Sequence, residues 1–394
     1  MILTKKQEEG LKIAVQRYKQ GERYTTIAGY AGTGKSTLVK FIIAALGLYN
    51  EDVAYVAYTG KAALVLKEKG CPNATTAHRL LYQSFPRQDG TFFHKPRRPL
   101  EYPYKLIVVD EVSMLPKEMW DLLLSHRVYI LALGDPGQLP PIGEDNGILA
   151  EPHIFLDEIM RQAQESEIIR LSMSVREGRP LELYKGNEVQ IIDKKELVSG
   201  MFTWADQVLV AKNETRRNIN QLMRGYIHGV EDTKPINGDK VICLQNDWEN
   251  VNCFGDVMVN GSIGVIKNIR KDYSVHPLLQ PGLKVDFQPD YIDEDTLNIH
   301  GEDCCFNHLL TDYKLLTLGE KTVNQQNFKF FNKRIPRPKE LDYGYAITCH
   351  KSQGSEYDKV LVLEEWLKGG DHARWLYTAA TRAKEKLVIV RDYK

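Results

Sequence analysis

The sequence lacks the features of a secreted, zinc-stapled or membrane-spanning protein. Its six cysteines include no C-x-x-C pair, and no stretch that resembles a signal peptide opens the chain. No uninterrupted apolar run approaches the ~18 residues that a membrane helix needs. We therefore expect free thiols, a cytoplasmic location and no membrane segment, and the cysteine spacing disfavours a structural zinc site.

The chain also lacks an excess of charge of either sign: its formal net charge is zero, because 52 Lys and Arg residues balance 52 Asp and Glu residues. This balance neither supports nor excludes a nucleic-acid partner, so any such site has to be a local patch. The chain has 394 residues, of which 43% are hydrophobic and 26% charged. These values are typical of a globular protein with about two to four domains.

The segment from residue 25 to residue 37 is the most informative part of the chain. A short β-type run ends at Gly29, and Gly29, Gly34, Lys35 and Ser36 fit the pattern G-x-x-x-x-G-K-[ST] ahead of a helical pattern. Backbone N–H groups of such a loop face phosphates, and the new helix adds its positive N-terminus. We expect Lys35 to reach the terminal phosphates and Ser36 to hold Mg²⁺. The predicted phosphate-binding residues are Gly29, Ala31, Gly32, Thr33, Gly34, Lys35, Ser36 and Thr37.

Polar residues follow two further apolar strands. The run 106–109 leads into Asp110 and Glu111, and the run 129–133 leads into the loop that carries Gln138. Asp110 is predicted to bind the Mg²⁺ shared with Ser36, and Glu111 to orient and deprotonate the attacking water. Because ligands of open parallel sheets bind beyond the carboxyl ends of the strands, we expect these side chains to meet at one site.

The segment 84–104 interrupts this pattern with prolines and a glycine, and it is interpreted as an inserted loop or hairpin. Phe92 and Phe93 are adjacent within it and are flanked by basic residues. A solvated basic loop is the ordinary interpretation. Adjacent phenylalanines at a turn favour instead a wedge or stacking platform.

After residue 155 the α/β pattern begins again, with buried-type strands at 208–211, 360–363 and 387–390. The stretch from about 240 to 342 differs, because glycines and prolines separate short alternating runs, as in a small β-barrel. Its acidic run 290–295 is interpreted as a solvated loop. A nuclease site is disfavoured, since no second acidic cluster accompanies Asp110.

Several motifs, in this order, resemble the helicase motifs of superfamily 1. They are segments 29–37, 57–63, 110–111, 134–141, 345–356 and 377–383. The series covers nearly the whole chain. The compact size, the short insertion before Asp110 and the barrel-like insertion before Tyr345 resemble the RecD and phage Dda branch, superfamily 1B.

The resemblance implies an α/β fold with two RecA-like P-loop NTPase domains, a small hairpin insertion in the first and an SH3-like β-barrel insertion in the second. Domain 1A is expected to span 1–155 and to contain the hairpin or pin at 84–104. Domain 2A is expected to consist of 156–240 and 343–394, and domain 2B to span 241–342. ATP with Mg²⁺ is then expected in the cleft between the RecA-like domains.

The resemblance also assigns roles to single residues. Gln7 is similar to the adenine-reading glutamine, Gln138 to the γ-phosphate sensor and Glu356 to the ribose-contacting acid. The catalytic set is then Lys35, Glu111, Gln138 and two arginine fingers, Arg161 and Arg382. The DNA-contacting positions are Thr59, Lys61, His78, His350 and Ser352, with Phe92 and Phe93 as candidates for the strand-separating pin. For His78, an ordinary polar or core role remains an equal alternative.

The implied activity is that of an ATP-dependent DNA helicase or translocase. Such an enzyme moves 5′ to 3′ on single-stranded DNA and separates duplex, although no residue of the chain itself shows the direction. The expected substrates are single strands and junctions with duplex, the working unit is a monomer, and replication or recombination proteins are candidate partners. Two alternatives remain open: an RNA-directed superfamily 1 helicase, and a motor or loading subunit of a recombination or repair complex with little unwinding alone.

Overall fold

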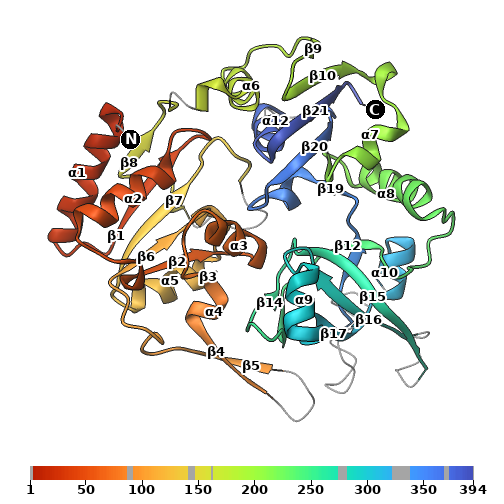
Figure 1. The fold of residues 1–394 in the computed structure, drawn as a ribbon, viewed down its shortest axis with the longest axis horizontal. Helices are drawn as coiled ribbons and strands as arrows, with labels where there is room; N and C mark the ends of the chain where they lie inside the picture. Colours follow the sequence, from red (N-terminus) through yellow and green to blue (C-terminus); the bar gives the residue numbers. More distant parts are fainter. Residues whose placement is uncertain are drawn as a thin grey trace. The chain divides into compact units, whose positions relative to one another are not determined.

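The structure is a computed structural model that describes residues 3–86, 92–140, 147–160, 163–273, 282–321, 338–367 and 372–393, without the side chains of Pro86, Phe92, Trp248 and Glu249. The chain divides into two compact units (Figure 1). The first unit comprises Met1–Gln83, Pro96–Lys212 and Thr348–Lys394, and the second comprises Ser84–Lys95 and Asn213–Ile347. Because both predicted RecA-like regions contribute to the first unit, the boundary between them near residue 155 remains a prediction.

A parallel six-stranded sheet forms the core of the N-terminal half of the first unit, in the order β3-β2-β6-β7-β1-β8. Its inner strands are buried along almost their whole length, which explains their continuous apolar sequences. Helices α1 and α2 pack on the sheet through Ala14, Leu38 and Ile42. The strands are β1 (Tyr24–Gly29), β2 (Val53–Ala57), β3 (Ala74–Thr76), β6 (Leu106–Val109), β7 (Tyr129–Gly134) and β8 (Ile154–Leu156).

A second sheet lies in the same unit, with β11, β20, β21, β10 and β9 side by side. The pairs β11–β20, β20–β21 and β21–β10 are parallel, and β9 is antiparallel to β10. The fold class predicted from the sequence, with two RecA-like α/β regions, is therefore confirmed. These strands are β9 (Tyr184–Lys185), β10 (Val189–Asp193), β11 (Gln207–Val210), β20 (Tyr357–Leu363) and β21 (Ala383–Arg391), and β19 (Ala346–Thr348) precedes β20 in the chain.

The second unit contains a five-stranded antiparallel sheet in the order β17-β16-β15-β12-β18. Lys339, next to β18, donates its backbone N–H to Leu310 at 2.7 Å and accepts from Asp312 at 2.9 Å, so the two edges of the sheet meet. This closure agrees with the predicted small barrel, whereas the SH3-like subtype remains a prediction. The strands are β12 (Lys240–Cys243), β13 (Asp247–Val251), β14 (Val257–Met258), β15 (Ile263–Asp272), β16 (Gly282–Pro289), β17 (Phe306–Thr311) and β18 (Leu341–Tyr343).

The predicted insertion after residue 84 is a two-stranded sheet of β4 (Tyr82–Pro86) and β5 (Phe92–Pro96). Phe85 and Phe93 stack within it, with ring centroids 5.2 Å apart and an interplanar angle of 21°. Phe93 remains 43% exposed, so an aromatic surface faces solvent on this hairpin.

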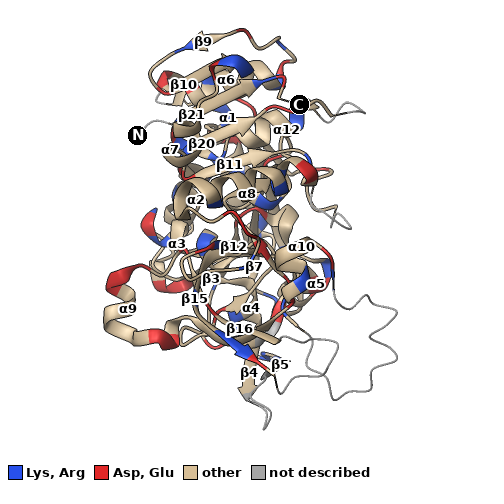
Figure 2. Ribbon diagram, turned by 90° about the vertical axis from the view of Figure 1, so that its right-hand side faces the viewer, with Lys and Arg blue, Asp and Glu red and all other residues tan. Residues whose placement is uncertain are grey.

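Helix α2 begins in the phosphate-loop motif, as the helical pattern there predicts. One interpretation is corrected: the acidic run is not a loop throughout, because Asp293 accepts the backbone N–H of Thr296 and caps α9, around which acidic residues gather (Figure 2). Acidic side chains favour this position because a helix N-terminus is positive. Among the described helices, none is long and apolar enough to cross a membrane. The helices are α1 (Lys5–Lys19), α2 (Lys35–Ala45), α3 (Gly60–Glu68), α4 (Ala77–Leu81), α5 (Lys117–Ser125), α6 (Glu167–Arg176), α7 (Ser199–Trp204), α8 (Asn213–His228), α9 (Glu294–His300), α10 (Tyr313–Leu318) and α12 (His372–Ala380).

Candidate nucleotide site

The phosphate loop joins the carboxyl end of β1 to the first turn of α2. Gly32 and Gly34 both have φ of 76°, a left-handed conformation that side chains rarely adopt. A Cβ atom on Gly34 would also overlap Gln7 Nε2 and Met160 Sδ. Lys35 Nζ donates to the carbonyl oxygens of Gly29 and Tyr30 at 2.7 and 3.1 Å, so the ammonium group lies at the mouth of the loop. The predicted phosphate-loop residues therefore occupy one turn with the geometry that their pattern requires.

Gln7 lies beside this loop and is 1% exposed. Its Nε2 donates to the Thr33 carbonyl oxygen at 3.0 Å, and its Oε1 accepts the backbone N–H of Thr4 at 3.0 Å. The second bond completes a capping box with Thr4 at the start of α1. Gln7 thus ties α1 to the phosphate loop, a role that the T-x-x-Q spacing could have indicated. Its predicted contact with adenine remains a prediction.

The two acids after β6 differ in backbone conformation. Asp110 donates its backbone N–H to Val56 at 2.9 Å and continues the strand, whereas Glu111 has φ of 49° and ψ of 49°. A left-handed glutamate is strained, and such strain concentrates at functional sites. The turn brings the Glu111 backbone N–H within 3.0 Å of Asp110 Oδ1 and redirects the Glu111 side chain.

Both carboxyl groups have raised pKa values. Burial raises the pKa of Asp110, against the lowering effect of the nearby Lys35 ammonium. Burial also raises the pKa of Glu111; the Arg382 guanidinium opposes this shift, and the Asp110 carboxylate adds to it. A carboxylate with a raised pKa is a stronger base at neutral pH, which suits proton abstraction from water.

Gln138 reaches the same place from the loop after β7. Its Nε2 lies 3.4 Å from Glu111 Oε1, so the predicted phosphate sensor and the predicted base are hydrogen-bond neighbours. Their strand ends, β6 and β7, are adjacent in the parallel sheet. The side chains after β6 and β7 therefore meet at one edge of the sheet, as expected for the carboxyl ends of parallel strands.

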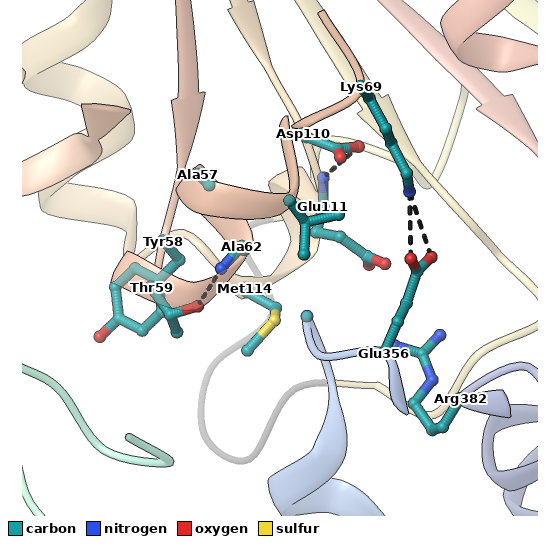
Figure 3. A pocket seen from close by; sticks show the side chains of 12 residues that line it. Ala57, Tyr58, Thr59, Ala62, Lys69, Asp110, Glu111, Met114, Glu356 and Arg382 are labelled. Atoms are coloured by element: carbon teal, nitrogen blue, oxygen red, sulfur yellow. Dashed lines mark hydrogen bonds and ion pairs between the residues drawn. The ribbon is translucent and has the colours of Figure 1, made fainter. Parts of the chain in front are cut away.

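A pocket contains these acids together with residues from the C-terminal part of the chain (Figure 3). Arg382, at the start of β21, is 4% exposed and is fixed by bonds from Nε to the Thr378 carbonyl and from Nη1 to the Ser355 carbonyl. Glu356 accepts two bonds from Lys69 Nζ, at 3.1 and 3.4 Å. The pocket is lined by Ala57, Tyr58, Thr59, Ala62, Val65, Lys69, Asp110, Glu111, Met114, Gly354, Glu356 and Arg382. Arg161, the other predicted finger, lies outside the described residues.

A neighbouring cavity of about 240 Å³ has Ser36 and Asp110 in its lining. No three His, Cys, Asp or Glu side chains of the described segments are grouped as a metal site. Mg²⁺ in nucleotide sites needs no such cage, because one or two protein oxygens and the phosphates hold it. One hydroxyl and one carboxylate beside the phosphate loop therefore fit the predicted ion.

The residues predicted to contact DNA have varied surroundings. Thr59 caps α3 by accepting the backbone N–H of Ala62 at 3.2 Å. Lys61 Nζ lies 4.3 Å from the centre of the Tyr357 ring. His78 is 5% exposed and stacks on Tyr82, and Ser352 is fully buried and donates to the Cys349 carbonyl at 2.7 Å. His350 is half-buried in the same short helical turn. These side chains have structural partners, and their contact with DNA remains a prediction.

Comparison with known proteins identifies the family. A family model described as an AAA domain matches residues 3–199, half of the chain, and a UvrD-like helicase C-terminal domain matches residues 343–390. The ATP-dependent RecD2 DNA helicase of Deinococcus radiodurans is 27% identical over 98% of this chain and 49% of its own length. The ATP-dependent DNA helicase dda of Enterobacteria phage T4 is 28% identical over 45% of this chain and 43% of its own length. The chain belongs to the AAA-domain family, and its sequence is similar to the RecD2 and dda helicases.

The chain spans only about half the length of RecD2, of which 49% is covered. Its fold is also similar to that of a chain in a structure of two coordinating Pif1 helicases at forked double-stranded DNA, with a TM-score of 0.50, 17% identity, and coverage of 99% of this chain and 92% of that chain. This likeness concerns the fold, and it agrees with the two sheets of mainly parallel strands.

Sequence reasoning missed Lys69 and Tyr377 in this site. Lys69 joins Glu356, and Tyr377 joins the phosphate loop to Asp135. These partners are 287, 346 and 242 residues away in the sequence. No spacing rule connects residues so distant, so only the folded chain reveals these contacts.

Proposed function

We propose that this chain is an ATP-driven DNA helicase that moves 5′ to 3′ along a single strand and separates duplex. The observation that carries the proposal is the pocket in which Asp110 and Glu111 meet Glu356 and Arg382 from the distant C-terminal part of the chain. A hydrolytic site made of two halves is completed only when both halves are in place, which lets ATP turnover alternate with movement. The relatives RecD2 and dda, named as ATP-dependent DNA helicases, support the use of ATP and of DNA.

The proposed chemistry assigns one task to each charged group. Lys35 and the loop N–H groups bind phosphates, Glu111 accepts a proton from the attacking water, and Gln138 orients that water or senses the terminal phosphate. Arg382, with Arg161 as a second finger, stabilises negative charge that develops on the transferred group, an effect worth about 10³ to 10⁵ in rate for arginine fingers. Glu356 and Gln7 are assigned to the ribose and the adenine.

Mg²⁺ would be held by Ser36 and Asp110 and would supply charge neutralisation at the phosphates. The Ser36 hydroxyl and the Asp110 carboxyl group line the same cavity beside the phosphate loop, which supports this assignment. Glu111 stays outside the ion's ligand set in the proposal, because its strained turn directs it toward Gln138.

Coupling to DNA requires a strand that spans both RecA-like domains. Thr59, Lys61 and His78 would bind it on the first domain, and His350 and Ser352 on the second. A strand gripped in this way advances when the cleft closes and opens. The stacked pair Phe85 and Phe93 supports a separating function for the hairpin, with Phe92 as its neighbour. We further propose domains 1A (1–155), 2A (156–240 and 343–394) and 2B (241–342), and a monomer as the working unit.

The test is steady-state ATP hydrolysis by the purified chain with no polymer, with single-stranded DNA and with RNA of the same sequence. Unwinding of duplexes with a 5′ or a 3′ tail follows on the same preparation. We expect stimulation by DNA and unwinding from the 5′ tail only. Stronger stimulation by RNA than by DNA would indicate that RNA is the substrate. Stimulation by DNA without unwinding would indicate a motor or loading subunit of a recombination or repair complex. No stimulation by either polymer would overturn the proposal.

A further inference from the structure

The hydroxyl group of Tyr377, on α12, lies between two loops of the nucleotide site. It accepts the backbone N–H of Ala31 in the phosphate loop at 2.8 Å and donates to Asp135 Oδ2 at 2.7 Å. Tyr377 is 2% exposed, so water does not compete for these bonds. Burial and the neighbouring Asp135 carboxylate raise the pKa of Tyr377 far above its usual value, and the hydroxyl therefore keeps its proton.

The same helix also fixes the loop that carries Gln138. Thr378 Oγ1 accepts the backbone N–H of Leu139 at 2.8 Å, and Gln353 Nε2 donates to the Leu139 carbonyl at 2.5 Å. Asp135 uses its other oxygen to accept the backbone N–H of Gly137 at 2.9 Å. Side chains from the C-terminal part thus hold the backbone after Gln138 directly at Leu139, and they act on the backbone before it through Asp135.

Close packing at Gly137 shows how tightly Tyr377 fits. A Cβ atom at this position would lie 3.0 Å from Tyr377 Cε1 and 3.1 Å from Tyr30 Cδ1. Tyr30 itself contacts the Arg176 guanidinium, which lies 3.8 Å from the centre of its ring. The phosphate loop and the Gln138 loop therefore meet against Tyr30 and Tyr377, whose ring centroids are 6.4 Å apart.

We propose that Tyr377 is a positioning residue for ATP hydrolysis, which holds the phosphate loop and the Gln138 loop in register with Arg382. The link to Arg382 is short: its guanidinium is bonded to the carbonyl of Thr378, the residue after Tyr377. Tyr377 touches no reacting atom, so it acts through Ala31 and Asp135. This inference rests on the proposed ATPase activity.

The test compares Tyr377→Phe with Tyr129→Phe. Tyr129 is a matched control, because it is 6% exposed and its hydroxyl bonds Thr25 Oγ1 at 2.5 Å and the Ala14 carbonyl at 3.2 Å, at the strand ends opposite the phosphate loop. Both variants lose a buried hydroxyl with two partners. We expect Tyr377→Phe to lower kcat for ATP at least about tenfold, the scale on which an unpaired buried donor or acceptor acts. KM for ATP and the affinity for a fluorescent ADP analogue should change less than about threefold, since the other loop N–H groups are intact.

A double-mutant cycle identifies the partner. If Tyr377 acts through Asp135, the variant that combines Tyr377→Phe and Asp135→Asn has a kcat close to that of the less active single variant. If the two side chains act independently, the fold losses of kcat in the single variants multiply in the double variant. Wild-type kcat in Tyr377→Phe, or an equal loss in Tyr129→Phe, overturns the inference while the proposed function stands. A parent chain that hydrolyses no ATP overturns both.

Discussion

At the scale of single residues, Glu111 combines a strained backbone with two charged neighbours, Asp110 and Arg382. Its left-handed turn costs on the order of 1 kcal/mol or more, a cost that a fold retains where the side chain must point in one direction. That direction brings Glu111 Oε1 to Gln138 and into the pocket with Arg382. We predict that Glu111→Gln keeps affinity for ATP and DNA but lowers kcat about 10² to 10⁴-fold, because an amide cannot accept the proton.

Steady-state turnover and equilibrium binding of an ATP analogue measure the two parts of this prediction. Glu118→Gln is the control, because this substitution removes the same charge from an exposed residue in the first turn of α5. Turnover within a few-fold of the parent in Glu111→Gln would remove Glu111 from the role of base.

At the scale of elements, the β4–β5 hairpin carries the stacked pair Phe85 and Phe93, of which Phe93 is exposed. Stacking of a nucleobase on an aromatic side chain contributes about 1 to 3 kcal/mol. We predict that replacing Phe92 and Phe93 together by Ala slows duplex unwinding several-fold and leaves DNA-stimulated ATP hydrolysis nearly unchanged. Tyr102→Ala is the control, because Tyr102 is an aromatic residue that is 58% exposed outside the hairpin. An unwinding rate equal to the parent's would contradict a separating function.

The barrel contains an ion pair whose pH dependence has a definite sign. Asp286, in β16, is 3% exposed; it accepts two bonds from Arg270 at 3.0 and 2.9 Å and the backbone N–H of His308 at 2.7 Å. Burial alone would raise the pKa of Asp286, but these donors outweigh it and hold the pKa below its usual value. The native state therefore binds this proton more weakly than the unfolded chain does, and the contribution of Asp286 to stability is lost as the pH falls through its native pKa.

We therefore predict that Asp286→Asn lowers the free energy of unfolding of the barrel by about 1 to 2 kcal/mol at pH 7, a range reduced because Arg270 is half exposed. The stabilities of parent and variant in urea titrations should begin to approach each other below pH ~4, where the unfolded carboxyl takes up its proton, and should converge as the pH falls through the lower native pKa of Asp286. Lys284→Ala, which breaks the more exposed pair with Asp272 in the same sheet, should have a smaller effect. A loss that grows toward low pH would show that the sign is wrong.

The elements also show why some of the structure could be predicted and some could not. Strand β6 and residues 360–363 of β20 are buried on both faces, so their sequences are continuous apolar runs that can be recognised from the sequence alone. The barrel strands gave only short alternating runs, so their pairing order and the closure at Lys339 were not predictable. The acids and Gln138 were found because strand ends converge, whereas Lys69 and Tyr377 depend on packing between distant segments.

At the scale of the whole molecule, the division into two compact units separates nucleotide binding from the barrel. Every residue that lines the pocket of Figure 3 belongs to the first unit, including Glu356 and Arg382 from the last segment of the chain. A ligand that binds only the native state stabilises the part that unfolds with its site. The second unit has its own antiparallel sheet and its own buried pair, Arg224 with Asp239 at 2.8 Å.

We predict that calorimetry resolves two unfolding transitions and that a non-hydrolysable ATP analogue with Mg²⁺ raises the midpoint temperature of only one of them. At an analogue concentration of about 100 times Kd, the gain is about 2.7 kcal/mol for the first unit. Lys35→Ala should abolish this shift, because the ammonium group at the mouth of the loop is lost, while the transition of the barrel stays in place. Equal shifts of both transitions would mean that the two units unfold together, and a shift that persists in Lys35→Ala would place the nucleotide away from the phosphate loop.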